Sequence, residues 1–272
     1  MVSDGARVRA KWWISSYRKS LVEGQMNYRT LGLIALVLAA PIHIHAQRGQ
    51  AGPPPTAQSA AAIDLTGYWV SVVTEDWRVR MVTPKKGYYE SLPLTAEARR
   101  IADAWDPAKD EAAGNQCKAY GAAAIMRVPG RLHFTWENPS TLRIDTDAGT
   151  QTRLFHFGAA QAPSGERTWQ GYSAAQWEYA RTGRGEARKG NLKVVTTNMR
   201  PGYVRKNGVP YGENAVVTEY YELITASDGV QWIILTTEVA DPMYLNPPFI
   251  TSTQFKKQPG ASGWNPTPCS AR

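Results

Sequence analysis

Short runs of β-forming residues follow one another along most of the chain, and this succession constrains the fold more than any other feature. The runs are rich in Val, Ile, Thr, Tyr and Trp, and turn pairs such as Asn138-Pro139 and Asp228-Gly229 separate them. They do not alternate with helical segments, as a parallel α/β sheet would require. The sequence therefore predicts an all-β, mostly antiparallel fold.

Long strands that carry large side chains on one face favour a closed, lipocalin-like β-barrel, because closure removes unpaired edges. A β-sandwich is the alternative. One inserted helix is expected near 95–105, where Thr95 is a suitable N-cap and Ala98, Ile101, Ala102 and Trp105 make an apolar stripe. The expected strands cover residues 67–74, 77–83, 125–128, 132–137, 141–147, 152–158, 171–180, 192–198, 215–225, 231–239 and 250–256.

The N-terminal segment has the features of a targeting sequence. Arg29 precedes an apolar run at 31–40 that is short for a membrane span, and Ala46 offers a small residue for cleavage. No Cys follows this run, so a lipid anchor is not expected. We divide the chain into an upstream extension and signal peptide (1–46), a flexible Pro/Gly/Ala-rich lead-in (47–62) and a single barrel domain with a Pro-rich tail (63–272). The expected location is periplasmic or secreted, with Met1 and Met26 both open as the start.

The charge balance changes once this segment is set aside. The chain holds 31 Lys and Arg against 23 Asp and Glu, a formal charge of +8. Six of these basic residues and two of the acids lie in 1–46, so roughly +4 remains, spread along the body apart from a basic loop at 181–189. A net charge of this size affects solubility and does not indicate a polyanionic partner. Neither nucleic acid binding nor a stable membrane anchor is expected.

Two cysteines, Cys117 and Cys269, are too few for a disulfide-rich scaffold. In an oxidising compartment they are candidates for one disulfide that closes a long loop and ties the C-terminal tail to the body. Two unpaired thiols are the alternative.

Several segments carry a family resemblance. Gly67-Tyr-Trp69 is similar to the opening strand of lipocalin-type barrels. The segments PLTAEARRIADAWDP, QCKAYG, WQGYSAAQWE with GNLKVVTTN, and DPMYLNPPF resemble a large family of secreted bacterial β-barrel proteins of unknown function with WDP, GHS-x-x-x-WEGDTLVV-type and DP-x-x-Y segments. Tyr172 stands where many members carry His, and an insertion follows Trp177-Glu178. The resemblance implies fold and secretion, and no established activity.

Alternation along the strands sorts the candidate catalytic residues onto faces. Glu178, Glu219, His156 and Asp145 are the candidates for acid–base chemistry if the protein is an enzyme. In one interpretation the His, Asp and Glu side chains face solvent and the Trp, Phe and Ile side chains form the core. In the other, some of these polar groups line a cavity.

Aromatic residues are abundant in the chain, and eight Trp remain beyond residue 46. Their flat apolar surfaces with a polar edge suit a ligand pocket, although a core built from aromatics is the alternative. The candidate ligand-binding residues are Tyr172, Trp177, Trp136 and Tyr220, with Glu178 and Glu219 as polar anchors.

No metal site or cofactor is expected, because His133 and His156 are far apart and no phosphate-binding Gly-rich motif exists. Three functions remain open. The first is binding of a small apolar or aromatic ligand inside the barrel, and the second is a cofactor-independent lyase, isomerase or hydratase. The third, an envelope structural or interaction protein, would follow if the barrel were filled by its own side chains. The sequence specifies neither the ligand nor the oligomeric state.

Overall fold

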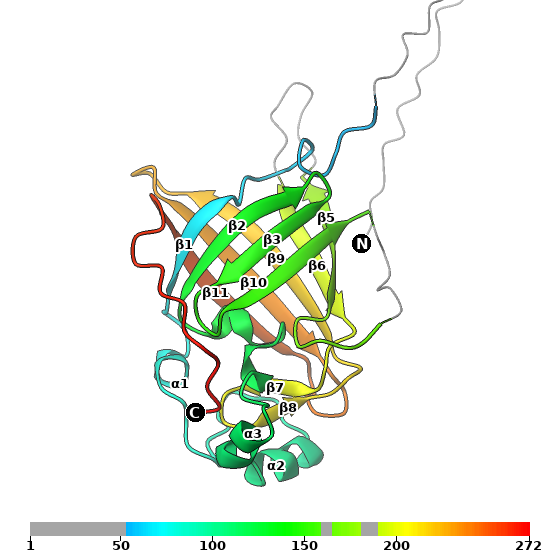
Figure 1. The fold of residues 1–272 in the computed structure, drawn as a ribbon, viewed down its shortest axis with the longest axis vertical. Coiled ribbons are helices and arrows are strands. Elements are labelled where there is room, and N and C mark those ends of the chain that lie inside the picture. The colour runs from blue at the N-terminus through cyan, green and yellow to red at the C-terminus, as the bar shows by residue number, and fades with distance from the viewer. Residues whose placement is uncertain (1–52, 159–164, 181–189) are drawn as a thin grey trace, which may run out of the picture. The chain divides into compact units, whose positions relative to one another are not determined.

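Nine strands form a closed barrel in the computed structural model, which describes residues 53–158, 165–180 and 190–272 (Figure 1). Their order around the barrel is β1-β11-β10-β9-β6-β5-β4-β3-β2, and neighbours are antiparallel except β4 and β5, which pair in parallel. The predicted all-β, lipocalin-like barrel is confirmed. The β-sandwich alternative is wrong, because β1 pairs with both β2 and β11 and so closes the sheet.

The barrel strands are β1 (Gly67–Val72), β2 (Arg131–Asn138), β3 (Thr141–Thr146), β4 (Gln151–Phe157), β5 (Tyr172–Tyr179), β6 (Gly190–Thr197), β9 (Val216–Thr225), β10 (Gln231–Ala240) and β11 (Phe249–Gln258). A separate two-stranded sheet contains β7 (Gly202–Arg205) and β8 (Val209–Tyr211). The helices are α1 (Trp77–Met81), α2 (Ala96–Asp103), α3 (Pro107–Ala112) and the 3-10 turns η1 (Lys118–Tyr120) and η2 (Ile125–Arg127).

The helix predicted near 95–105 is confirmed as α2. The hydroxyl of Thr95 accepts a hydrogen bond from the backbone N–H of Ala98 at 3.2 Å, as an N-cap should. Asp106 then caps α3 in the same way, through the backbone N–H of Ala108 at 3.0 Å. The turn predicted at Asp228-Gly229 also forms, in a hairpin that joins β9 to β10.

Two of the predicted strands are wrong. In the expected strand 77–83, residues 77–81 form α1 instead, because the chain turns at Asp76 (φ 50°) and the carbonyl of Asp76 accepts the N–H groups of Val79 and Arg80. In the expected strand 125–128, residues 125–127 form η2, and the carbonyl of Gly121 accepts the N–H of Ile125. Both segments are short, and a short apolar run has the same pattern in a strand and in a buried helical turn. The sheet of β7 and β8 was not predicted.

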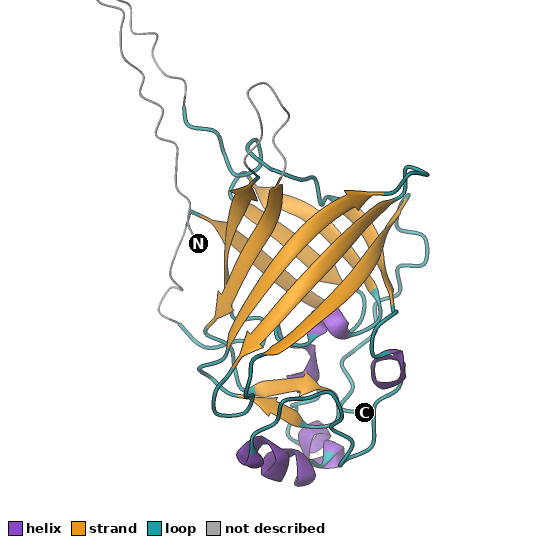
Figure 2. Ribbon diagram, turned by 180° about the vertical axis from the view of Figure 1, so that it is seen from behind, coloured by secondary structure: helices purple, strands orange, loops and turns teal. Residues whose placement is uncertain are grey.

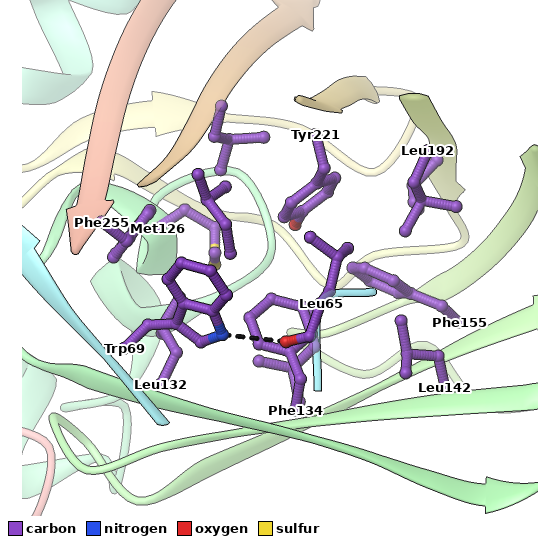
Figure 3. Close-up of a cluster of buried hydrophobic side chains, with 14 of the residues drawn as sticks. Leu65, Trp69, Met126, Leu132, Phe134, Leu142, Phe155, Leu192, Tyr221 and Phe255 are labelled. Atoms are coloured by element: carbon purple, nitrogen blue, oxygen red, sulfur yellow. Dashed lines mark hydrogen bonds between the residues drawn. The ribbon is translucent and has the colours of Figure 1, made fainter. Parts of the chain in front are cut away.

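The interior of the barrel is filled by its own side chains (Figure 3). Trp69, Phe134 and Phe155 have no exposed surface, and the indole N–H of Trp69 donates to the carbonyl of Leu65 at 2.8 Å. Tyr221 lies edge-on to both Phe rings, with centroid distances of 6.2 Å and 5.6 Å. These residues alternate with outward-facing ones, as the strand pattern predicted.

The two ends of the barrel are covered differently. Helices α1 to α3 and the β7–β8 sheet lie at one end, which we call the helical end (Figures 1 and 2). Residues 53–66, which we call the strap, cross the opposite end, which we call the mouth (Figure 1). The strap enters β1 at Gly67, whose φ of 98° favours glycine. The described residues begin at 53, within the segment expected to be a flexible lead-in.

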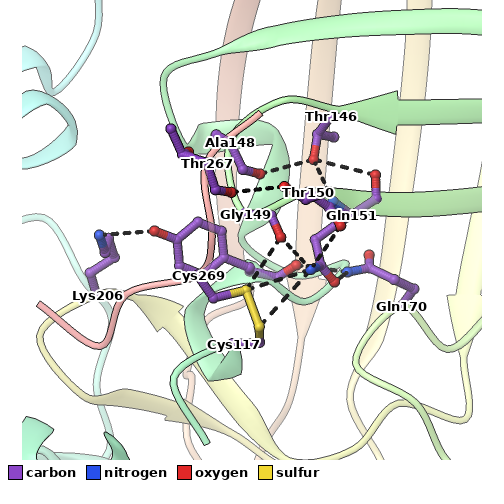
Figure 4. The surroundings of a disulfide bond; sticks show 11 residues. Cys117, Thr146, Ala148, Gly149, Thr150, Gln151, Gln170, Lys206, Thr267 and Cys269 are labelled. Carbon is purple, nitrogen blue, oxygen red and sulfur yellow. Dashed lines mark hydrogen bonds between the residues drawn. A yellow bond between two sulfur atoms is a disulfide. The ribbon is translucent and has the colours of Figure 1, made fainter. Parts of the chain in front are cut away.

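The disulfide predicted between Cys117 and Cys269 is confirmed (Figure 4). It joins the residue before η1 to the C-terminal tail, 152 positions away. The tail is also held by its backbone, since the N–H of Thr267 donates to the carbonyl of Asp147 at 2.8 Å. The C-terminal tail is therefore part of the packed domain.

Candidate functional site

Three aromatic rings gather inside the mouth of the barrel. Trp136 is near the end of β2, Phe157 ends β4 and Trp177 is near the end of β5, and alternation turns all three inward. Their ring centroids are 5.2 Å apart for Phe157 and Trp177, 5.6 Å for Trp136 and Phe157, and 6.5 Å for Trp136 and Trp177. Each ring is only partly buried, so the cluster retains accessible aromatic surface.

The strap is fastened over this cluster by hydrogen bonds. The indole N–H of Trp177 donates to the carbonyl of Ala57 at 2.8 Å, and the hydroxyl of Tyr179 donates to the carbonyl of Ala60 at 2.6 Å. The backbone N–H of Gln58 donates to the carbonyl of Pro139, in the β2–β3 turn, at 3.1 Å. The strap therefore spans the mouth from β5 to β2.

A cavity of about 290 Å³ lies between the strap and the aromatic cluster. This volume is close to the lower limit of typical small-molecule pockets. Asp64 on its rim accepts hydrogen bonds from the N–H of Thr66 at 2.9 Å and from its hydroxyl at 2.7 Å. The lining residues are Gln58, Ala61, Ile63, Asp64, Leu65, Thr66, Trp136, Leu142 and Trp177.

Of the predicted ligand-binding residues, only Trp136 and Trp177 line this cavity. Tyr172 lies on the outer face of the barrel, where it stacks on His156 with ring centroids 4.9 Å apart. Tyr220 is also on the outer face, beneath the ammonium of Lys193 at 5.4 Å. The strap residues of the cavity were missed, because a Pro/Gly/Ala-rich segment without periodicity has the composition of a linker.

Three of the four predicted acid–base residues are on the outer face. Asp145 pairs with Arg143 at 2.8 Å, and although burial alone would raise its pKa, the bonds from Arg143 and Thr152 outweigh this and hold the pKa below the usual value. Glu178 accepts from the side-chain amide of Asn191 at 3.1 Å. Burial lowers the pKa of His156. For these three residues the interpretation of a polar outer face holds.

Glu219 is the exception, because it points into the barrel and is completely buried. Arg153 donates to both of its carboxylate oxygens, Nη1 to Oε1 at 2.8 Å and Nη2 to Oε2 at 2.6 Å. Tyr221 donates a third hydrogen bond to Oε1 at 3.1 Å, and Nη2 of Arg153 also contacts Thr196. The carboxylate is therefore engaged on both oxygens.

The carboxylate of Glu219 stabilises the charged form of Arg153. Burial by itself lowers the pKa of Arg153, but the adjacent carboxylate of Glu219 outweighs burial and raises the pKa above its ordinary value. Burial, and then the charge of Glu219, raise the pKa of Tyr221 well above its ordinary value. Arg153 and Tyr221 therefore keep one protonation state over the physiological range, which suits a structural network.

Within the part of the chain that the structure describes, no helix is long and apolar enough to span a membrane. The same residues contain no group of three or more His, Cys, Asp or Glu side chains placed to hold a metal ion. Residues 1–52, which include the predicted signal peptide, and the basic loop at 181–189 lie outside the described residues. Comparisons with protein-family models, with curated proteins and with solved structures find no match.

Proposed function

We propose that the protein binds a small apolar or aromatic molecule at the mouth of the barrel, in the cavity between the strap and the Trp136–Trp177 cluster. The observation that carries this proposal is the cavity itself, about 290 Å³, with two partly buried indole rings in its wall. Indole and phenyl faces bind flat apolar molecules well, and the Gln58 and Asp64 side chains supply a polar rim.

The proposed site lies at the mouth of the barrel, whereas the sequence predicted that a ligand binds in its interior. The side chains around Phe134, Phe155 and Tyr221 fill the interior at close packing. A ligand therefore binds above this core and below the strap. None of Glu178, Glu219, His156 and Asp145 lines the cavity, so binding, and not acid–base catalysis, is the function we propose.

The disulfide Cys117–Cys269 supports a role in an oxidising compartment, where such bonds persist. Together with the targeting features at 26–46 it leads us to propose a periplasmic or secreted protein. We further propose membership of the secreted barrel family that the sequence resembles.

The filled interior also favours a second candidate, an envelope structural or interaction protein. In that case the mouth cavity would have no ligand, and Trp136 and Trp177 would only anchor the strap.

The test uses N-phenyl-1-naphthylamine, an uncharged aromatic probe whose fluorescence rises in apolar sites. We expect saturable binding with one site per chain, weakened about tenfold or more in Trp136→Ala, since one lost aromatic contact is worth about 1.4 kcal/mol. Trp232→Ala is the matched control, because Trp232 lies on the outer face of β10 beside Lys256. The affinity of Trp232→Ala for the probe should stay within about twofold of that of the wild type.

Trp177→Phe separates the ring from its hydrogen bond to Ala57. If the strap closes the cavity, this variant binds the probe more weakly although the aromatic surface is largely kept. Equal affinities in the wild type, Trp136→Ala and Trp232→Ala would exclude the proposed site, and no saturable binding by the wild type would favour the structural role.

A further inference from the structure

A second pocket lies at the helical end of the barrel, remote from the strap, where α1, η2 and the end of β7 meet. Four of its lining residues are basic: Arg80 from α1, Arg127 from η2, Arg205 from β7 and the adjacent Lys206. Its volume is about 40 Å³. A water molecule in the liquid occupies about 30 Å³, so the pocket suits one small ion or the end group of a larger molecule.

Arg80 is the least usual residue of this pocket, because it is only 8 % exposed and lacks a carboxylate partner among the described residues. Its Nε donates to the backbone carbonyl of Arg127 at 3.0 Å. Neither Nη1 nor Nη2 has a hydrogen-bond partner within the described part of the chain. A guanidinium has five donors, and leaving buried ones unpaired destabilises the folded state. Arg80 is thus a buried cation with its terminal donors unused.

The carboxylates near the pocket already have partners other than Arg80. Asp76 accepts from Nη2 of Arg127 at 2.7 Å, which pairs those two charges. Glu75 accepts from the amide of Gln254 at 3.0 Å, and its charge reaches Arg80 more weakly than that of Arg127 does. Positive charge therefore exceeds negative charge around Arg80.

The other two basic side chains are held by neutral groups. Both terminal nitrogens of Arg205 contact the backbone carbonyl of Glu90 at 3.2 Å, and Arg205 itself is 7 % exposed. The ammonium of Lys206 contacts the hydroxyl of Tyr120 at 3.2 Å. These contacts fix the side chains in place without neutralising them.

The buried cations also repel one another. Burial, and after it the charge of Arg127, lower the pKa of Arg80 to about 10, and the same two causes lower the pKa of Arg205 to about 10. Both groups are still charged at neutral pH. An anion within reach would relieve this repulsion and occupy the free donors of Arg80.

We propose that this pocket binds a phosphate-type oxyanion, which Arg80 holds through its two terminal nitrogens while Arg205 and Lys206 add positive charge. The planar fork of a guanidinium matches two oxygens of one phosphate group. A dianion also offsets the excess charge better than a carboxylate does. The pocket takes either free phosphate or the phosphoryl end of a larger molecule whose remainder stays outside.

The experiment titrates the full chain with inorganic phosphate at constant ionic strength, set with chloride, and follows the thermal unfolding midpoint. A ligand that binds only the folded state raises this midpoint with its concentration. We expect a saturable rise in the wild type and none in Arg80→Met, which keeps the length of the side chain but removes its donors. Arg78→Met is the matched control, since Arg78 belongs to the same helix but stacks on exposed Trp77 at 5.2 Å and does not line the pocket.

A second readout separates an anion site from a structural arginine. Without phosphate, Arg80→Met should unfold at the same midpoint as the wild type or higher, because an unpaired buried cation is replaced by an apolar chain. Lys206→Met serves if Arg80→Met does not fold, and it should weaken phosphate binding about threefold or more by removing one charge. Affinity for phosphate in Lys206→Met equal to that of the wild type would then overturn the proposal.

Parallel titrations identify the ligand class. sn-Glycerol 3-phosphate binding at least as tightly as phosphate indicates the phosphoryl end of a larger molecule, and weaker binding indicates free phosphate. The proposal is overturned if acetate raises the midpoint as much as phosphate does, or if Arg80→Met responds like the wild type. Because the probe used for the mouth cavity is uncharged, the two sites are tested independently.

Discussion

Arg153 and Glu219 form a two-point ion pair inside the barrel, with both side chains completely removed from solvent. The two residues are 66 positions apart and come from β4 and β9, which are not neighbours in the sheet. The pair therefore links opposite parts of the barrel wall across its interior. The hydrogen bond from Arg153 to Thr196 brings a third strand, β6, into this buried network, and Tyr221, on β9 like Glu219, donates to the carboxylate.

Breaking this pair on one side should destabilise the protein strongly. Glu219→Leu leaves the guanidinium of Arg153 buried without its partner, and we expect a loss of about 3–5 kcal/mol in the free energy of unfolding. The double variant Arg153→Met with Glu219→Leu should recover most of this loss, because no uncompensated charge remains. Urea unfolding measures both, and equal losses in the single and double variants would contradict this account.

Removing the disulfide should also reduce stability. Its cysteines are 152 positions apart, and the loop-entropy model assigns a link of that length about 5 kcal/mol. We expect Cys117→Ala with Cys269→Ala to lower the free energy of unfolding by several kcal/mol relative to the oxidised wild type. Reduced wild type should unfold like the double variant. A large difference between these two would show that the cysteines stabilise the protein by packing instead.

Stability should decrease in mild acid because of His156. Burial lowers its pKa in the folded state, whereas the unfolded chain keeps a value of about 6.5. Below about pH 6.5 the unfolded state therefore binds more protons than the folded state, and the free energy of unfolding falls as the pH drops toward the folded pKa. His156→Gln should unfold with a smaller difference between about pH 7.5 and about pH 5.

Asp145 does not confound this measurement. Asp145 has a lowered pKa when folded, so its contribution to stability is lost only as the pH falls below about 3.8. If His156→Gln shows the same dependence as the wild type between neutral pH and pH 5, burial of His156 is not the cause.

Gly67 should tolerate no other residue without cost. Its φ of 98° disfavours L side chains, and a Cβ there would lie 3.2 Å from the ammonium of Lys257. We expect Gly67→Ala to lower the free energy of unfolding by about 1–2 kcal/mol. Gly260→Ala, with an ordinary φ and open space around it, is the control and should change it by less than about 0.5 kcal/mol.

Alternation made the faces of the strands predictable. In β4 it separates Arg153, Phe155 and Phe157 from His156, and the structure has the first three inside the barrel and His156 outside. The sequence did not separate Glu219 from Glu178, since both were candidates for the same role, and the structure places Glu219 inside the barrel and Glu178 outside. Alternation does not predict which residue an inward side chain contacts across the barrel, because that contact depends on the order of the strands around the ring.

The strap and the Arg80 pocket were beyond prediction for different reasons. The strap is fastened through the backbone carbonyls of Ala57 and Ala60, which any residue would provide, so its composition carries no signal. The pocket depends on α1, a five-residue helix whose alternating apolar and basic residues resemble a strand. Only tertiary contacts bring Arg80 to Arg205, 125 positions away in the sequence.

The pairing of β1 with β11 has a consequence for how the ring can be completed. β1 gains its second neighbour, β11, only after residues 249–258 have been added to the chain. Any shorter chain leaves β1 and β10 as two open edges, and open edges invite pairing with other molecules. Closure of the ring therefore joins contacts of the greatest sequence separation in the fold, and we expect it to be a slow step and the one at which incomplete chains aggregate.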